Sequence, residues 1–184
     1  VVHAIDPDKA LADLQKTTLS TGPQGESPVS ASEINLSDAE IAKIKSMNAT
    51  AVIPMHKMSG DWSQAQINGL KYQFEIMGVE VLAVTDAGFK AEKQVSDIET
   101  LLAKNPDILI SIPTDPTATA PAYRKAAEQG VILVFMDNVP NGFVAGKDYI
   151  SAVSADNMGN GVASAHLMAK ALNQQGEIGI IFHA

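Results

Sequence analysis

Five acidic and amide side chains stand at the ends of apolar runs in this sequence, beside its single tryptophan. The six residues are Asp61, Trp62, Asp86, Asp115, Asp137 and Asn138. Carboxylates and amides can bond several hydroxyl groups at once. An indole face can cover the apolar side of a sugar ring, and small-molecule sites combine aromatic walls with a few placed polar groups. The set therefore predicts a site for a hydroxyl-rich small molecule.

Each aspartate also has a simpler explanation, because an aspartate that precedes a helix commonly caps it. For any single aspartate, capping and ligand contact are equally good interpretations, whereas the whole set beside Trp62 favours a ligand site. Taken alone, Trp62 is better explained by half-buried packing. His56 ends the first apolar run and is a candidate for a hydrogen bond to the ligand rather than for catalysis.

No sequence motif for catalysis or for a bound cofactor accompanies these residues. The sequence has no GxxxxGK[ST] phosphate loop, no GxGxxG after its first apolar run and no GxSxG nucleophile elbow. Its histidines lack metal-ligand spacing, and the absence of cysteine excludes thiolate metal sites, disulfides and cysteine nucleophiles. We therefore expect a binding protein rather than an enzyme, with neither a cofactor nor a metal ion.

The elements that would position these residues repeat along the chain. Apolar runs typical of buried strands begin near Ala51, Val79, Asp107 and Val131. Helical patterns fill the intervals, over 62–77, 91–104 and 119–129. The runs are continuous rather than alternating, as in strands covered on both faces. With right-handed crossovers this spacing predicts an α/β fold, a doubly wound parallel sheet that binds its ligand at the carboxyl ends of the strands.

The flanking segments are more varied. Asp6 and Pro7 predict the start of a short helix, and residues 18–35, rich in Ser, Gly and Pro, predict a surface strap. Ser37 and Glu40 form a capping-box pattern that begins a second helix. Beyond the fourth strand we expect a short strand, a long helix and another strand, over 150–154, 156–173 and 177–182. A sheet that stops after such a strand suggests a fragment, or a fold that a second chain completes.

Composition and charge argue against two kinds of partner, nucleic acid and the interior of a membrane. The 184 residues are 46% hydrophobic and carry a net charge of −8, with no clustered basic face. An acidic chain of this kind argues against nucleic acid, whose binders usually show such a face. No apolar run approaches the ~18 residues of a membrane span. No signal peptide is present at Val1, as in the mature form of an exported protein.

The run from Ala51 to Ala184 resembles the type I periplasmic binding proteins of sugar ABC importers, the ribose- and galactose-binding family. The resemblance is carried by GDWSQAQINGLKYQFEIMG, VTDAGF, QVSDIETLLAKNPDILISIPTD, AAEQGVILVFMDN and VSADNMGNG, in this order. It implies that Trp62 stacks on the sugar and that Asp115 bonds its hydroxyls. It places Asp137 and Asn138 at the cleft or hinge, whereas Asp61 is a looser match and His56 has no firm counterpart.

The same resemblance implies the organisation and the function of the protein. We expect an N-terminal extension over 1–49, a first ligand-binding lobe over 50–138, a hinge over 139–148 and the start of a second lobe over 149–184. The protein would capture a monosaccharide or polyol between two hinged lobes and deliver it to an ABC permease in the membrane. It would act as a monomer, periplasmic or extracellular, with or without a membrane anchor.

The alternative within the same fold is the ligand-sensing domain of a lactose-repressor-type transcription regulator. Such a regulator carries a basic helix-turn-helix before the first strand, whereas residues 1–50 are acidic to neutral and rich in Ser and Pro. A small α/β enzyme, acting for example on a phosphosugar, is a third hypothesis. It would need a nucleophile, a metal cluster or a phosphate loop, and the sequence contains none of these.

Overall fold

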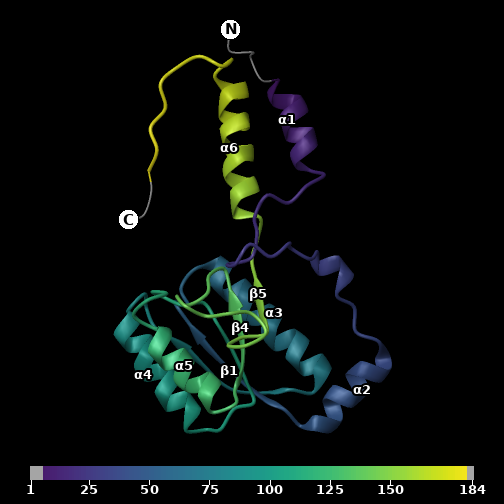
Figure 1. Cartoon of the computed structure of the whole chain (residues 1–184), viewed down its shortest axis with the longest axis vertical. Helices are drawn as coiled ribbons and strands as arrows, with labels where there is room; N and C mark the ends of the chain where they lie inside the picture. Colours follow the sequence, from purple (N-terminus) through teal and green to yellow (C-terminus); the bar gives the residue numbers. More distant parts are fainter. Residues whose placement is uncertain (1–5, 182–184) are drawn as a thin grey trace. The chain divides into compact units, whose positions relative to one another are not determined.

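The computed structural model describes residues 6–181, which form two compact units (Figure 1). Unit 2 is continuous, Val29–Ser154, and unit 1 combines residues 6–28 with residues 155–181. The hinge expected over 139–148 stays a prediction, because the units are defined by contacts within each part and not by motion.

Unit 2 contains a sheet of five parallel strands, which confirms the predicted fold class. The strands lie in the order β2–β1–β3–β4–β5. Their bounds are β1 Thr50–Met55, β2 Glu80–Asp86, β3 Ile108–Ser111, β4 Ile132–Met136 and β5 Ser151–Val153. Because all run the same way, the loops after β1 to β4 leave one edge of the sheet, here called the carboxyl edge.

Helices cover both faces of this sheet. On one face α4 and α5 lie side by side and bury a cluster around Tyr123 and Phe135, and on the other α3 lies beside α2 over a cluster around Ile53 and Phe74 (Figure 1). Their bounds are α2 Asp38–Met47, α3 Asp61–Met77, α4 Ala91–Leu102 and α5 Ala120–Glu128, with a short 3-10 turn, η1, at Ala31–Glu33. The sheet is therefore doubly wound, with an apolar cluster packed on each of its faces.

Local sequence signals set the helix ends. The Ser37 hydroxyl accepts from the backbone N–H of Glu40, whose carboxylate accepts from the backbone N–H of Ser37 at 2.8 Å, so the predicted capping box is present. Helix α3 ends at Gly78, which has φ 68° and is the left-handed cap expected there. A Cβ at this position would stand 2.9 Å from the Lys45 side chain, so glycine also permits α2 to approach.

Burial of the strands differs from the prediction at the sheet's borders. Strands β1 and β3 are almost wholly buried, whereas the outer strand β2 is half-buried and β5 is exposed. A continuous apolar run predicts a strand that helices cover on both faces of the sheet. Strand β2 departs from this because it is an outer strand of the sheet, with a neighbour on one side.

Unit 1 pairs the two remote ends of the described chain. Helix α1, Pro7–Leu14, is capped by Asp6 and packs on α6, Asn157–Ala171. Asp8 and Lys170 join the two helices through an ion pair of 2.6 Å. The predicted amino-terminal helix is thus confirmed, together with the long helix after the fourth strand.

The last predicted strand, 177–182, is wrong over the residues that the structure describes. Residues 177–181 have no regular secondary structure, and Ile178, Ile180 and Ile181 are exposed, while residue 182 lies outside the described part. An apolar run becomes a strand when a neighbouring strand satisfies its backbone, and residues 177–181 have no such neighbour. Between residues 6 and 181 no helix combines the length and apolar character that crossing a membrane requires.

Candidate functional site

The carboxyl edge brings together an imidazole and two exposed aromatic rings. His56, directly after β1, is 9% exposed, and its ring contacts the edges of Trp62 and Phe89 at centroid distances of 6.1 and 5.1 Å. Trp62 comes from the first turn of α3 and Phe89 from the loop after β2. Trp62 is 51% and Phe89 59% exposed, so both rings present apolar surface to solvent beside a buried polar ring.

The surroundings of His56 favour the neutral form of its imidazole. Burial is the largest cause that lowers the pKa of His56 below 6.5, and the charge of Lys57 acts in the same direction. Asp137 and Asp86 oppose this shift, which places both carboxylates within electrostatic reach of the imidazole. A neutral imidazole offers one N–H donor and one nitrogen acceptor, the pair of functions that a hydroxyl group can use.

Buried polar atoms without a partner gather at this same edge. Between residues 6 and 181, five buried side-chain atoms have no hydrogen-bond partner: His56 Nδ1, Ser63 Oγ, Thr85 Oγ1, Thr114 Oγ1 and Asn138 Oδ1. They lie at the end of β1, the first turn of α3, the end of β2 and the loops after β3 and β4. Unpaired buried polar groups are rare and call for an explanation. A polar ligand that supplies the missing hydrogen bonds is one such explanation.

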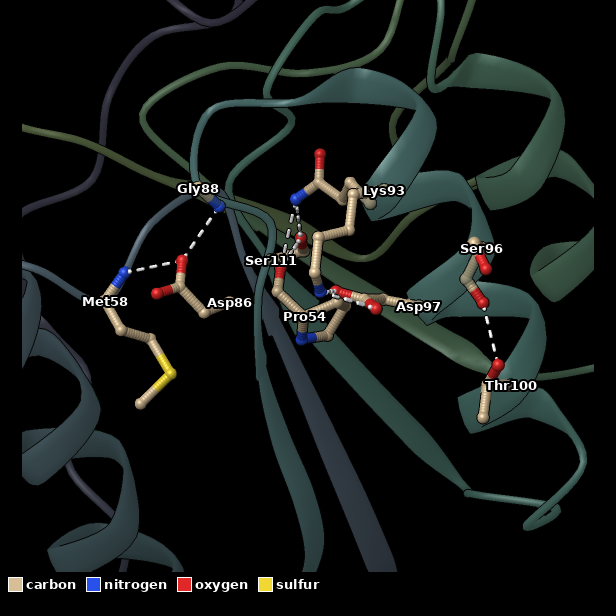
Figure 2. A network of polar contacts seen from close by, with 10 residues as sticks. Pro54, Met58, Asp86, Gly88, Lys93, Ser96, Asp97, Thr100 and Ser111 are labelled. Atoms are coloured by element: carbon tan, nitrogen blue, oxygen red, sulfur yellow. Dashed lines mark hydrogen bonds and ion pairs between the residues drawn. The ribbon is translucent and has the colours of Figure 1, made fainter.

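Two of the predicted aspartates are engaged in shaping loops. Asp86 Oδ1 accepts hydrogen bonds from the backbone N–H groups of Met58, at 3.1 Å, and Gly88, at 2.8 Å (Figure 2). Asp115 Oδ1 accepts from the backbone N–H groups of Thr117 and Ala118, which lowers its pKa. The capping interpretation is wrong for both, because α4 and α5 follow Lys90 and Thr119 and neither helix has a side-chain cap. Each aspartate stabilises its own loop instead, and Asp115 remains exposed and can also contact a ligand.

Asp137 and Asn138 follow β4 and tie neighbouring loops together. Asp137 has φ 61°, and its backbone N–H donates to the Val153 carbonyl at 2.9 Å. The Asn138 amide donates to the Pro113 carbonyl at 3.4 Å, while its own oxygen is the unpaired atom named above. Asp137 lies within electrostatic reach of His56, and Asn138 is joined to the loop that carries Asp115.

Of the predicted site residues, Asp61 and Asp115 have the weakest structural connection to His56 and Trp62. Asp61 is the first residue of α3 and is exposed. In the described part of the chain, neither residue forms a hydrogen bond or an ion pair with His56 or Trp62. They remain candidates because both lie at the carboxyl edge, Asp61 after β1 and Asp115 in the loop after β3.

Sequence reasoning missed a buried glutamine that fixes this edge. Gln94 of α4 is fully buried, and its amide nitrogen donates to the carbonyls of Pro54, at 3.1 Å, and Ile112, at 2.9 Å. Pro54 and Ser111, at the ends of β1 and β3, belong to the same network (Figure 2). The available signal was the position of Gln94 four residues before Ile98, on the apolar face of the helix, where a polar residue needs buried partners.

A hollow of unit 2, at the opposite edge of the sheet, is a less suitable ligand site than the carboxyl edge. It has a volume of about 390 Å³ at the amino edge of the sheet and is lined by residues such as Met47, Pro106, Asp107 and Ile132. The Asp107 carboxylate is already bonded to the backbone and hydroxyl of Thr50. The unpaired buried atoms of the described chain lie instead at the carboxyl edge, and we therefore place the functional site there.

No metal centre accompanies this site within the described residues. Between residues 6 and 181 no three His, Asp or Glu side chains are grouped so that they could hold a metal ion. The residues at the carboxyl edge offer hydrogen-bonding atoms and aromatic surface.

A doubly wound parallel sheet of this kind is an open α/β fold, in which ligands bind at the carboxyl edge. The profile of the periplasmic binding protein domain matches residues 51–184. The chain therefore belongs to the periplasmic binding protein family, and its resemblance to the type I sugar-binding members is confirmed.

Similar proteins agree with this assignment. The chain is 31% identical over 109 residues to the ribose import binding protein RbsB of Bacillus subtilis, a match over 54% of this chain and 35% of the relative. The chain thus spans about a third of the curated relative that it matches.

Two solved structures show the same fold over a larger share of the chain. The Caulobacter myo-inositol binding protein matches with a TM-score of 0.59 and 28% identity, covering 68% of this chain and 41% of that one. The arabinose binding protein of Geobacillus stearothermophilus matches with a TM-score of 0.60 and 26% identity, covering 70% and 43%.

Proposed function

We propose that the protein binds a monosaccharide or polyol at the carboxyl edge of unit 2, as the solute-binding component of an ABC importer. Trp62 covers an apolar face of the ligand, and His56 and Asn138 take the unpaired hydrogen bonds with its hydroxyls. Asp61, Asp115 and Asp137 add acceptors around this group. The single observation that carries the proposal is the gathering of the unpaired buried polar atoms at this edge, beside an exposed indole.

The rest of the proposed function concerns the whole protein. We infer that a second lobe contributes further contacts, so that ligand binding favours a closed state. The closed monomer then delivers its ligand to a membrane permease from the periplasmic or extracellular side. The family and its named relatives support this role, since they are solute-binding proteins rather than enzymes.

Calorimetric titration with D-ribose, L-arabinose and myo-inositol tests the proposal, since these are the ligands in the names of the relatives. We expect heat of binding for at least one of them and a matching change in the fluorescence of Trp62, the single tryptophan. Trp62→Ala should weaken that binding by at least about tenfold. The matched control is Tyr72→Ala, which removes an exposed ring from the middle of α3.

Binding of none of the three ligands, together with unresponsive fluorescence, would count against the proposal. Equal affinity of Trp62→Ala and the wild type would remove the indole from the site.

A further inference from the structure

Phe89 occupies a backbone conformation that aromatic residues seldom adopt. Its φ is 61°, in the left-handed region, and the preceding Gly88 has φ 56°. A bulky residue at such an angle is strained, and strain of this kind concentrates at ligand-binding and active sites. An asparagine or glycine would form the same turn with less strain. The presence of an aromatic residue at this position therefore needs another explanation.

Hydrogen bonds to neighbouring loops hold Phe89 in this conformation. Its backbone N–H donates to the His56 carbonyl at 2.8 Å, and Asp86 fixes the adjacent Gly88 N–H at 2.8 Å (Figure 2). The same Asp86 oxygen accepts from the backbone of Met58. The loop after β1 and the loop after β2 are thereby joined, and these hydrogen bonds fix the backbone that carries the Phe89 side chain.

The ring itself stands beside the imidazole of the candidate site. It meets His56 at 5.1 Å with an interplanar angle of 65°, and the Lys57 ammonium lies 4.9 Å from its centroid. Even with these contacts the residue is 59% exposed. Trp62 contacts the same imidazole at 6.1 Å and is also half exposed. His56 is therefore flanked by two rings that keep open surface, and its Nδ1 has no partner.

We propose that Phe89 is a second aromatic wall of the ligand site, which contacts a C–H face of a cyclic sugar or cyclitol while Trp62 contacts another part of the same ligand. The inference rests on the proposed function and adds a residue to its site. A cyclic polyol combines apolar C–H faces with hydroxyls around its rim. Aromatic walls suit the faces, and the His56 nitrogen between the walls suits a hydroxyl.

The test separates the ring from the turn that carries it. Phe89→Asn keeps a residue that tolerates the left-handed region but removes the ring, and Phe89→Tyr keeps the ring. Each variant is titrated calorimetrically with whichever of D-ribose, L-arabinose and myo-inositol binds the wild type most tightly. We expect Phe89→Asn to weaken binding by about tenfold or more and Phe89→Tyr to stay within about threefold. We also expect the melting temperature of Phe89→Asn to equal or exceed that of the wild type, because the turn is relieved of strain.

The outcomes distinguish this inference from the function on which it rests. If Phe89→Asn binds as tightly as the wild type while Trp62→Ala loses binding, Phe89 does not contact the ligand, but the proposed sugar-binding function is retained. A loss of affinity in Phe89→Asn that comes with a lower melting temperature overturns the wall in favour of a structural role. If the wild type binds none of the three ligands, the proposed function fails and the wall with it.

Discussion

The side-chain oxygen of Gln94 accepts a hydrogen bond of 2.7 Å from the backbone N–H of Thr114. A buried residue of α4 therefore fixes the start of the loop that carries Asp115. Because the Gln94 amide nitrogen also bonds the carbonyls of Pro54 and Ile112, one side chain joins the ends of β1 and β3 to this loop. The positions of the proposed ligand contacts depend on this buried amide.

Replacing Gln94 with alanine should destabilise unit 2. The change leaves the Ile112 carbonyl and the Thr114 N–H without their Gln94 partner, whereas the Pro54 carbonyl still accepts from the Ser111 hydroxyl. An unsatisfied buried group costs about 1–3 kcal/mol. We expect the urea midpoint to fall accordingly, with the slope of the transition unchanged. Ser96→Ala, at an exposed position of the same helix, is the matched control. Equal midpoints for the two variants would contradict the role assigned to Gln94.

His56 should make stability depend on pH on the acidic side of neutrality. Its pKa in the folded chain is lowered below 6.5 by burial and by Lys57. The unfolded chain therefore takes up the proton first, and stability is full above 6.5 and is lost as the pH falls from 6.5 toward the folded value. The free energy of unfolding, measured at about pH 7.5 and about pH 5, should fall more in the wild type than in His56→Gln. An identical fall in both proteins would show that His56 is not the responsible group.

Two variants separate the role of Asp115 in stabilising its loop from its proposed role in binding. Asp115→Asn keeps a side-chain oxygen that can accept from Thr117 and Ala118, so its thermal stability should match that of the wild type. Its affinity for sugar should fall, since a neutral amide replaces a charged acceptor. Asp115→Ala should lose both stability and affinity. If Asp115→Asn retains full affinity, the loop hydrogen bonds alone account for this residue.

Asp156 should control whether residues 19 and 20 remain attached to α6. Its carboxylate accepts from the backbone N–H groups of Leu19 and Ser20, each at 2.9 Å, and from the Gly159 N–H at the start of α6. These bonds lower the pKa of Asp156 to about 2, the Leu19 backbone being the largest cause.

Hydrogen exchange tests this attachment. In Asp156→Ala the Leu19 and Ser20 amides should exchange faster than in the wild type, while amides of β3 in unit 2 should not change. The wild type should lose the same protection as the pH falls from 3.8 toward about 2, because protonation then removes the charged acceptor. Unchanged exchange at Leu19 in Asp156→Ala would contradict this role.

The sequence was sufficient to predict the fold because its local signals agree with one another. Continuous apolar runs predicted the first four strands, and Gly78 and the pair Ser37 and Glu40 predicted helix ends that the structure confirms. The gathering of strand ends at one edge then followed from the parallel direction of the strands. His56 and Trp62 are in contact at that edge, as this reasoning requires.

The remaining features depend on partners that are distant in the sequence. A run such as residues 177–181 forms a strand only beside another strand, and apolar content cannot report whether that neighbour is there. Gln94 bonds residues 18 to 40 positions away in the chain. Phe89 matters through a backbone angle that nothing in its residue type indicates. The roles proposed for the site residues remain predictions until ligand binding is measured.

Unit 1 is assembled from both ends of the described chain, with the whole of unit 2 between them. During synthesis, residues 29–154 leave the ribosome as an uninterrupted stretch, and β1 to β4 can begin to form the sheet before α6 has emerged. Helix α1 must wait through that interval without the helix on which it packs. Helix α1 is thus made before every strand of the sheet but gains its packing partner after all of them, so in the nascent protein it is open to chaperones and proteases for longer than any strand.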